Sequence, residues 1–308
     1  MLRRLALIAS ALTGLPLAVA WFLSEQLLHP KPRVEDNSLD TMPLPAEPLS
    51  FASRDGTHLA GWFIPAAGRS RPAPGVVLSH GWARSRCELL PHARFLHRAG
   101  FAVLMFDYRH RGESAGDAIT MGVRERSDLL GAIDTLCARP EVDADRVGVF
   151  GMSMGSVVAI LVGARDERVR AICAEAPFAT HQAIMTRSLR HYFHLPSFPV
   201  AYLTRWIFKL RVGAPLDDID PIDHVAGFSP RPIFILACER DAVIGCEETE
   251  RLYAAAREPK RFWLIAGADH ARGWQAAGAE YEQRVIAFFQ EALGASEPAY
   301  TGERSTAT

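Results

Sequence analysis

The chain has 308 residues, of which 49% are hydrophobic and 22% are charged, and its formal net charge is −1. This composition is typical of a globular protein, and a chain of this length does not require two domains. A net charge near zero excludes a whole-molecule field that attracts nucleic acid, so we expect no nucleic-acid partner. The five cysteines include no C-x-x-C pair, which indicates neither a zinc site nor a disulfide framework; a Cys238–Cys246 bridge is left open.

The amino terminus departs from this composition. After MLRR, residues 5–23 contain no charged side chain over 19 residues, which is long enough for a helix to span a bilayer. We therefore predict a signal anchor over residues 1–28, with the folded body on the extracytoplasmic side of the membrane. A cleaved signal peptide is the alternative, because Ala18-Val19-Ala20 matches a small-x-small site, and it would leave a secreted or periplasmic protein. The apolar run continues past that site, which favours the anchor over both this alternative and a buried soluble helix.

A proline-rich linker is predicted over residues 29–47, and a folded domain over residues 48–295. Its first part holds two alternating stretches around Arg54-Asp55-Gly56, and Asp-Gly between such stretches is typical of an antiparallel hairpin. From residue 76 onward, short apolar runs alternate with helical patterns of 12 or more residues. The apolar runs are VVLSHG, FAVLMFDY, RVGVFG, VRAICAEA, RPIFILAC and RFWLIAG. This alternation predicts an α/β fold with a mostly parallel, doubly wound sheet covered on both faces.

The region at about 178–230 interrupts the alternation with aromatic residues, prolines and helical stretches. We interpret it as a helical cap inserted between two strands. Its aromatic side chains are expected mainly to pack on the core and to leave a partly apolar pocket. After the closing helix, residues 296–308 are predicted to be a disordered tail.

VFGMSMGS places Ser153 at the carboxyl end of a predicted strand, where a helix begins. Ligands bind beyond the carboxyl ends of strands in an open parallel sheet. Gly151 and Gly155 relieve crowding at a tight turn, so that the serine can adopt a strained backbone and display its hydroxyl. The pattern therefore predicts a nucleophile, although a helix-capping serine would also fit the local sequence.

A serine hydroxyl needs a base, and the base needs an orienting carboxylate. Asp241 and His270 each follow a later predicted strand, in the order that this kind of turn requires. We predict that Ser153, Asp241 and His270 form a catalytic triad. Three other carboxylates remain alternatives for the acid, namely Glu175, Asp220 and Asp223.

Acyl transfer also needs donors for the oxyanion, each of which lowers the barrier by about 3 kcal/mol. The backbone N–H of Met154 lies behind the predicted nucleophile at the start of a helix. The second donor is expected to be the N–H of Trp82, with Ala83 as the alternative. His80 is expected to hold this loop by hydrogen bonds rather than to act as the base.

These motifs together resemble the α/β-hydrolase family. H80-G81-W82, D107-Y108-R109-x-x-G112-x-S114, G151-M152-S153-M154-G155, D241 and H270 follow the order of that family, over about residues 48–293. Within it, the chain is similar to serine hydrolases of the prolyl-oligopeptidase and serine-aminopeptidase type and to membrane-anchored bacterial members. The resemblance implies the Ser153–Asp241–His270 triad, the oxyanion donors Trp82 and Met154, and a cap over the site. Cys238 stands where a glycine is common in the family.

The sequence predicts a serine hydrolase that cleaves a small-molecule carboxylic ester or related acyl compound without a cofactor or a metal. His191 and His194 could form half of a metal site, but no third ligand is evident. An aminopeptidase or amidase is the alternative, with Asp217, Asp218 and Asp220 available to hold an α-amino group. A non-catalytic, membrane-tethered binding protein is the other alternative. Neither the substrate nor the oligomeric state follows from the sequence.

Overall fold

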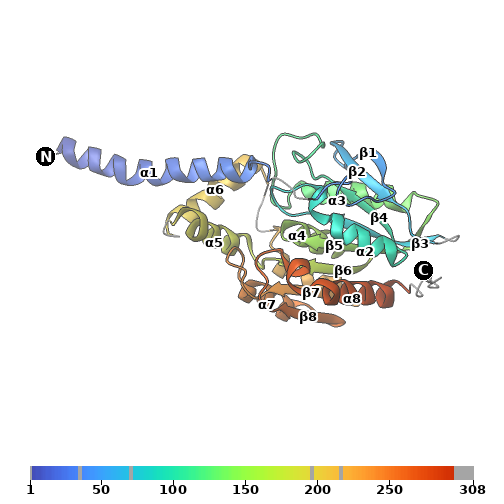
Figure 1. Ribbon diagram of the computed structural model, residues 1–308. Helices are drawn as coiled ribbons and strands as arrows, with labels where there is room; N and C mark the ends of the chain where they lie inside the picture. Colours follow the sequence, from blue (N-terminus) through green and yellow to red (C-terminus); the bar gives the residue numbers. More distant parts are fainter. Residues whose placement is uncertain (1, 34–36, 69–71, 195–197, 215–217, 295–308) are drawn as a thin grey trace.

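The computed structural model describes residues 2–33, 37–68, 72–194, 198–214 and 218–294 (Figure 1). An eight-stranded sheet runs through the described part of the chain, in the spatial order β1-β2-β4-β3-β5-β6-β7-β8. Its strands are β1 (Glu47–Ala52), β2 (His58–Ile64), β3 (Ala73–Ser79), β4 (Ala102–Phe106), β5 (Val142–Met152), β6 (Val169–Glu175), β7 (Ile233–Cys238) and β8 (Lys260–Ile265). β1 and β2 form an antiparallel hairpin, β2 is antiparallel to β4, and the remaining pairs are parallel. The fold predicted from the sequence is confirmed.

The helices cover both faces of this sheet (Figure 1). They are α1 (Leu2–Leu28), α2 (Leu90–Arg98), α3 (Glu125–Cys137), α4 (Met154–Gly163), α5 (His181–Phe193), α6 (Val200–Val212), α7 (Cys246–Ala255) and α8 (Gly273–Leu293), with 3₁₀ turns at Arg86–Leu89, Pro221–Asp223 and Val225–Phe228. Alternate strand residues enter different clusters because successive side chains point to opposite faces of a strand. Val77 packs with α3 and α4, whereas Val76 and Leu78 pack with α2 and α8.

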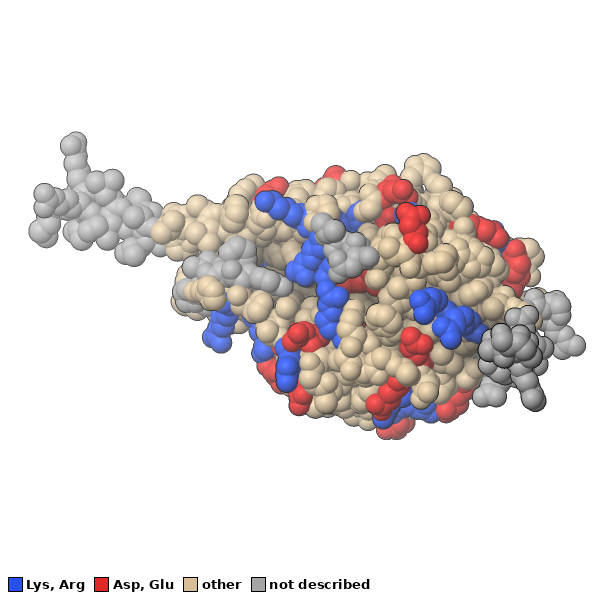
Figure 2. All heavy atoms as spheres, viewed as in Figure 1, with Lys and Arg blue, Asp and Glu red and all other residues tan. Residues whose placement is uncertain are grey.

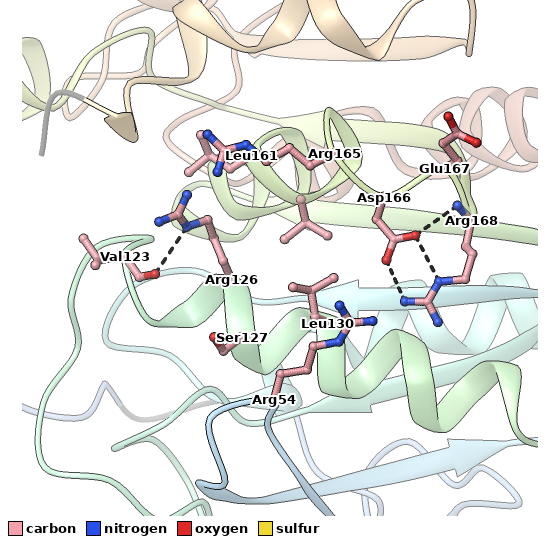
Figure 3. Close-up of a pocket in the computed structure, with 11 residues that line it drawn as sticks. Arg54, Val123, Arg126, Ser127, Leu130, Leu161, Arg165, Asp166, Glu167 and Arg168 are labelled. Atoms are coloured by element: carbon pink, nitrogen blue, oxygen red, sulfur yellow. Dashed lines mark hydrogen bonds and ion pairs between the residues drawn. The ribbon is translucent and has the colours of Figure 1, made fainter. Parts of the chain in front are cut away.

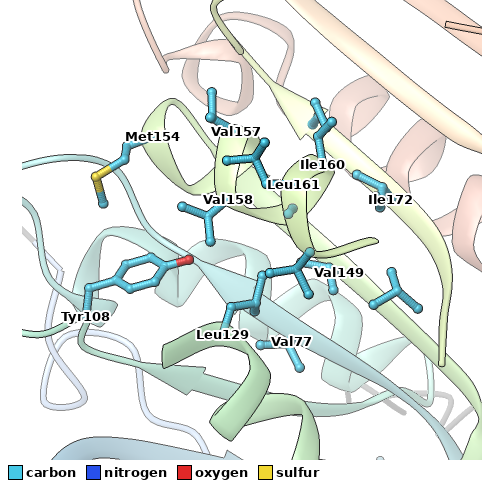
Figure 4. Packing of buried hydrophobic residues seen from close by; sticks show 14 of the residues in the cluster. Val77, Tyr108, Leu129, Val149, Met154, Val157, Val158, Ile160, Leu161 and Ile172 are labelled. Atoms are coloured by element: carbon cyan, nitrogen blue, oxygen red, sulfur yellow. The ribbon is translucent and has the colours of Figure 1, made fainter. Parts of the chain in front are cut away.

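The helix behind the predicted nucleophile is apolar on all sides. Every residue of α4 is buried, and a helix of this kind is stable only inside the protein. Figure 4 shows Val157, Val158 and Leu161 of α4 beside Val77 and Val149 of the central strands. This packing fixes the start of α4, and therefore the turn that carries Ser153, against the middle of the sheet.

Two helices between β6 and β7, α5 and α6, form the cap, and the amino-terminal helix α1 packs along α6 (Figure 1). Leu23 of α1 is buried with Leu189, Val200 and Ala201 of the cap. Arg211 of α6 donates to the Ser24 hydroxyl at 3.0 Å and pairs with Glu25. The last turns of α1 are therefore attached to the folded body.

Within the described residues, no helix combines the length and the apolar character needed to cross a membrane. The signal anchor over residues 1–28 therefore stays a prediction.

The segment that follows α1 also lies against the body. The carbonyl of Leu28 accepts from the Ile119 N–H at 2.8 Å, and the carbonyl of Pro30 accepts from Arg111 at 3.0 Å. The predicted boundaries of the linker and of the domain remain predictions, and the predicted tail over 296–308 lies outside the described residues.

All five cysteines have free thiols, so Cys238 and Cys246 are not joined by a disulfide bond.

The expectation that the cap aromatics pack on the core is only partly correct. Phe178 and Phe208 are buried, but Phe198, Tyr202 and Trp206 are exposed. The reason is that α6 is apolar on two sides, and the body covers only one of them.

Candidate active site

Ser153 lies in the turn between β5 and α4, with φ 53° and ψ −117°. A backbone of this kind costs a non-glycine residue about 1–3 kcal/mol and persists only where its surroundings enforce it. The flanking glycines are required by close approach of the backbone. A Cβ on Gly155 would lie 2.0 Å from the Ser79 carbonyl oxygen, and a Cβ on Gly151 would lie 2.6 Å from the Gly155 oxygen. The spacing of the glycines is thus explained by packing at the turn.

Hydrogen bonds to the neighbouring strand hold this turn. The Ser153 N–H donates to the Glu175 carbonyl at 2.8 Å. The buried Ser156 hydroxyl lies 2.7 Å from both the Gly151 and the Glu175 carbonyl oxygens. These bonds join the end of β5 to the end of β6 and keep the Ser153 side chain directed into the cavity.

The structure brings Ser153, His270 and Asp241 into one hydrogen-bonded series. The Ser153 Oγ lies 3.0 Å from His270 Nε2, and His270 Nδ1 lies 2.7 Å from Asp241 Oδ2. A carboxylate only accepts, so Nδ1 carries the proton, and Nε2 is left to accept from the serine hydroxyl. The three side chains follow β5, β7 and β8, whose carboxyl ends meet at one edge of the sheet.

The environment of Asp241 favours its charged form. Burial of this side chain acts to raise its pKa, but the hydrogen bond and charge of His270 and the backbone N–H groups of Ile244 and Val243 outweigh burial. These N–H groups donate to Asp241 Oδ1 at 2.8 and 2.9 Å. The pKa of Asp241 therefore lies below its ordinary value, and the carboxylate is ionised at neutral pH.

The alternative acids have other partners. The carboxylate of Glu175 is buried, which raises its pKa, and it accepts from the Gly273 N–H at 2.9 Å and from the Tyr281 hydroxyl. Asp220 accepts from His181 Nδ1 at 2.7 Å, on the cap. Asp223 lies in the 3₁₀ turn Pro221–Asp223 of the same region. Among the described residues, Asp241 is the carboxylate that is hydrogen-bonded to His270.

The two predicted oxyanion donors line the same cavity as Ser153, and so does Ala83. Met154 is the first residue of α4, where a helix leaves its N–H groups without an intrahelical partner and its dipole favours an anion. The indole of Trp82 donates to the Leu27 carbonyl at 3.1 Å, which fixes the loop beside the serine. Their role as donors remains a prediction.

His80 lies below this loop and is completely buried. Its Nδ1 lies 2.8 Å from the Gly81 carbonyl, and its Nε2 accepts from the Tyr108 N–H at 3.0 Å. Burial lowers the pKa of His80 to about 4, so the ring is neutral at pH 7 with its proton on Nδ1. Nδ1 is thus bonded within its own loop, and Nε2 joins this loop to the segment that follows β4.

The segment that follows β4 braces these loops. Asp107 accepts from the Arg86 N–H at 2.7 Å and from the Glu113 N–H at 3.0 Å. Arg109 forms an ion pair with the buried Asp128 at 2.6 Å.

The cavity at Ser153 has a volume of about 350 Å³ and a mainly apolar lining. It is formed by α1, the segment after it, the loop after β3, the cap and the loops that carry Val243 and His270. The apolar side chains in this lining are Leu23, Leu27, Pro30, Trp82, Ala83, Met121, Met154, Phe178, Ile184, Met185, Leu189 and Val243. The contribution of α1 was not predicted, because an uncharged run of 19 residues gives no sign that its end packs on a protein site.

A second cavity, of about 560 Å³, lies between α3 and the end of α4 (Figure 3). Its lining is polar and includes Arg126 and Arg168, and Arg168 forms an ion pair with Asp166 at 2.6 Å. This lining holds neither a histidine nor a cysteine, and none of the predicted site residues belongs to it.

The chain matches the model of the prolyl oligopeptidase family over residues 90–296. It is 32% identical over 268 residues to YfhR of Salmonella typhi, a protein described as uncharacterized, and the match covers 82% of this chain and 84% of that protein. The esterase Pf2001 of Pyrococcus furiosus has a similar structure, with a TM-score of 0.70, 25% identity, and coverage of 86% of this chain and 100% of that chain. The α/β-hydrolase GrgF of Penicillium sp. sh18 shares the fold, with a TM-score of 0.66, 21% identity, and coverage of 82% and 100%.

Proposed function

The chain belongs to the prolyl oligopeptidase family and is a serine hydrolase with the α/β-hydrolase fold, and within that class we propose that it cleaves carboxylic esters or related acyl compounds. The observation that carries the proposal is the hydrogen-bonded series Ser153–His270–Asp241 at the base of an apolar cavity.

In the proposed reaction, the Ser153 oxygen attacks the acyl carbonyl while His270 Nε2 takes the hydroxyl proton. The tetrahedral oxyanion accepts hydrogen bonds from the backbone N–H groups of Trp82 and Met154, each of which contributes about 3 kcal/mol. His270 then gives its proton to the leaving alcohol, and an acyl-enzyme remains. Water, deprotonated by His270, attacks this ester, and His270 returns the proton to the Ser153 oxygen as the acid is released. Asp241 holds the imidazole in the required tautomer and stabilises its cationic form.

The lining of the cavity favours an acyl ester over an aminopeptidase substrate. Among the described residues, its lining includes the cationic side chain of Lys31, which would repel an α-ammonium group. Asp218 pairs with Arg165 and Asp220 with His181, and neither belongs to the described lining. The third predicted acid, Asp217, lies outside the described residues.

A fluorophosphonate and a panel of p-nitrophenyl esters, thioesters and aminoacyl anilides test the proposal. The full chain should label and should hydrolyse the esters, and Ser153→Ala should do neither. Ser188→Ala is the matched control, since this serine lines the same cavity and should label normally. Labelling retained in Ser153→Ala would exclude Ser153 as the nucleophile. Turnover of anilides in place of esters would favour an aminopeptidase, and no turnover of any substrate would favour a binding protein.

The uncharged run over residues 5–23 supports an amino-terminal membrane anchor with the catalytic body on the extracytoplasmic side. Fractionation and the mass of the mature protein test this location. If the mature protein is lighter than the full-length chain by the mass of a signal sequence, it is a secreted or periplasmic protein.

A further inference from the structure

Exposed large hydrophobic side chains are concentrated on one part of the molecule. Within the described residues, all but Leu264 lie on α1, on α6 or just before α6. They are Leu15, Leu17, Trp21 and Phe22 on the α1 side, and Phe198, Tyr202, Trp206 and Leu210 on the α6 side. We call these eight residues the α1–α6 surface. Exposed apolar side chains gathered on two neighbouring helices indicate an interaction site.

The α6 half of the surface is a regular row. Phe198, Tyr202, Trp206 and Leu210 are four residues apart, so that from Tyr202 onward they lie on one side of the helix. They are 76%, 57%, 55% and 61% exposed. The side of α6 that faces the body is apolar as well, because Ala201, Thr204, Ile207 and Phe208 are buried. The buried side chains hold α6 against the body, and the exposed row forms a second side of the same helix.

The α1 half lies next to α6 at Trp21. α1 packs along α6 and then extends away from the body (Figure 1). Arg211 of α6 lies over the ring of Trp21 at 4.8 Å, which joins the two halves. Figure 2 shows the described part of α1 that projects from the body as a tan surface without charged side chains.

The charge of α1 and α6 indicates which kind of partner binds the α1–α6 surface. α1 and α6 contain five basic residues and one acidic residue, Glu25, whereas the whole chain has a net charge of −1. Two copies of such a surface would repel each other, so self-association is disfavoured. An anionic lipid surface attracts basic groups, and Trp, Tyr and Phe beside basic residues are typical of helices that lie in a membrane interface.

We propose that the α1–α6 surface binds the interface of an anionic lipid bilayer, with the row on α6 inserted at the level of the headgroups. The α1 half of this surface lies within the predicted anchor over residues 1–28, whereas the α6 half is a contact that the anchor does not supply.

The position of the surface has a consequence for catalysis, which rests on the proposed esterase function. The same helices line the cavity, with Leu23 and Leu27 on α1 and Thr204 on α6. An acyl ester that resides in the bilayer would then reach Ser153 along these helices without passing through bulk water. Lipid-soluble esters are the substrate class that this arrangement suits.

Quenching of tryptophan fluorescence by lipids with brominated acyl chains tests the contact at α6 itself. The full chain is mixed with vesicles of phosphatidylcholine and phosphatidylglycerol, and the contribution of Trp206 is the difference between wild type and Trp206→Phe. We expect bromolipid to quench this contribution by at least twofold, and less in vesicles of phosphatidylcholine alone. No quenching of the Trp206 contribution would overturn the proposal, even if the full chain binds the vesicles through its anchor.

A binding measurement with matched variants completes the test. The double variant Tyr202→Ser/Trp206→Ser should bind the vesicles at least tenfold more weakly, or should be released from them at a salt concentration at least tenfold lower. Leu264→Ser, which removes the exposed leucine outside the surface, should change neither quantity. Ser153→Ala should bind like wild type, so that a failure of the catalytic proposal is distinguishable from a failure of this one. If wild type is a dimer by light scattering and the double variant a monomer with unchanged vesicle binding, the surface is a self-association site and the proposal is wrong.

Discussion

Filling the cavity from the α1 side should shorten the acyl chain that is hydrolysed best. Leu27 lines the cavity, while its carbonyl accepts from the Trp82 indole. Leu27→Trp keeps this backbone bond and adds side-chain volume beside Ser153. The change therefore tests whether the amino-terminal helix is part of the substrate site.

The magnitude follows from the cavity volume of about 350 Å³. A water molecule or a methylene group fills roughly 30 Å³, so the cavity holds about a dozen non-hydrogen atoms, or an acyl chain of about eight carbons beside the ester group. Each buried methylene contributes about 0.8 kcal/mol, which is about fourfold in kcat/KM. Octanoate should thus exceed butyrate by about 10² in wild type. A tryptophan in place of leucine adds about six non-hydrogen atoms, which fill the space that the longer acyl chain would occupy. The ratio of kcat/KM for octanoate to that for butyrate should therefore fall to about 1.

The assay is kcat/KM for p-nitrophenyl esters from acetate to laurate, with Leu264→Trp as the control for a tryptophan far from the cavity. The control should keep the wild-type dependence on chain length. If Leu27→Trp is folded, with an unchanged melting temperature, and still prefers octanoate by the wild-type ratio, then α1 does not form a wall of the acyl site and the volume argument is wrong.

Three further changes test the site and its support. Asp241→Asn should lower kcat for p-nitrophenyl esters by about 10⁴-fold, because the amide favours the wrong imidazole tautomer; a loss below tenfold would contradict the assigned role. Burial lowers the pKa of His92 to about 3, so below pH ~6.5 the unfolded chain binds a proton that the folded chain excludes. Stability therefore falls on acidification, and His92→Phe should reduce this slope by about 1.4 kcal/mol per pH unit in urea unfolding between pH ~4 and ~6, with an unchanged slope as the contrary result. Gly112 has φ +48°, and an added Cβ would lie 2.0 Å from Asp107 Oδ2, so Gly112→Ala should cost about 3 kcal/mol or more in unfolding free energy. Gly267→Ala, at φ +68° in open space, should cost only about 1 kcal/mol, and equal losses would refute the steric argument.

The sequence by itself determined the order of strands and helices that form the layers of the fold. It also determined where the polar residues of the site lie along the chain. Short continuous apolar runs and helical runs with a period of 3.6 depend on neighbours within a few residues, so they are visible without a structure. For the same reason, the glycines on both sides of Ser153 indicated the strained turn. Asp241 and His270 were located because each directly follows a strand, and parallel strands end at one edge of a sheet.

Only the tertiary structure decided which of several carboxylates contacts His270. Glu175 is the last residue of β6, at the same edge of the sheet, but its carboxylate is directed to the Gly273 N–H and the Tyr281 hydroxyl. Tyr281 lies 106 residues further along the chain. No local pattern reports a partner at that separation.

The tertiary structure also decided what covers the nucleophile. Leu23 and Leu27 of α1 line the cavity with Ile184 and Met185 of the cap, although the sequence suggested only that α1 is apolar. An apolar helix has the same composition whether it faces lipid, a core or a substrate. Which of these it contacts depends on surfaces contributed by distant segments, because burial of apolar side chains is favourable and has no preferred direction.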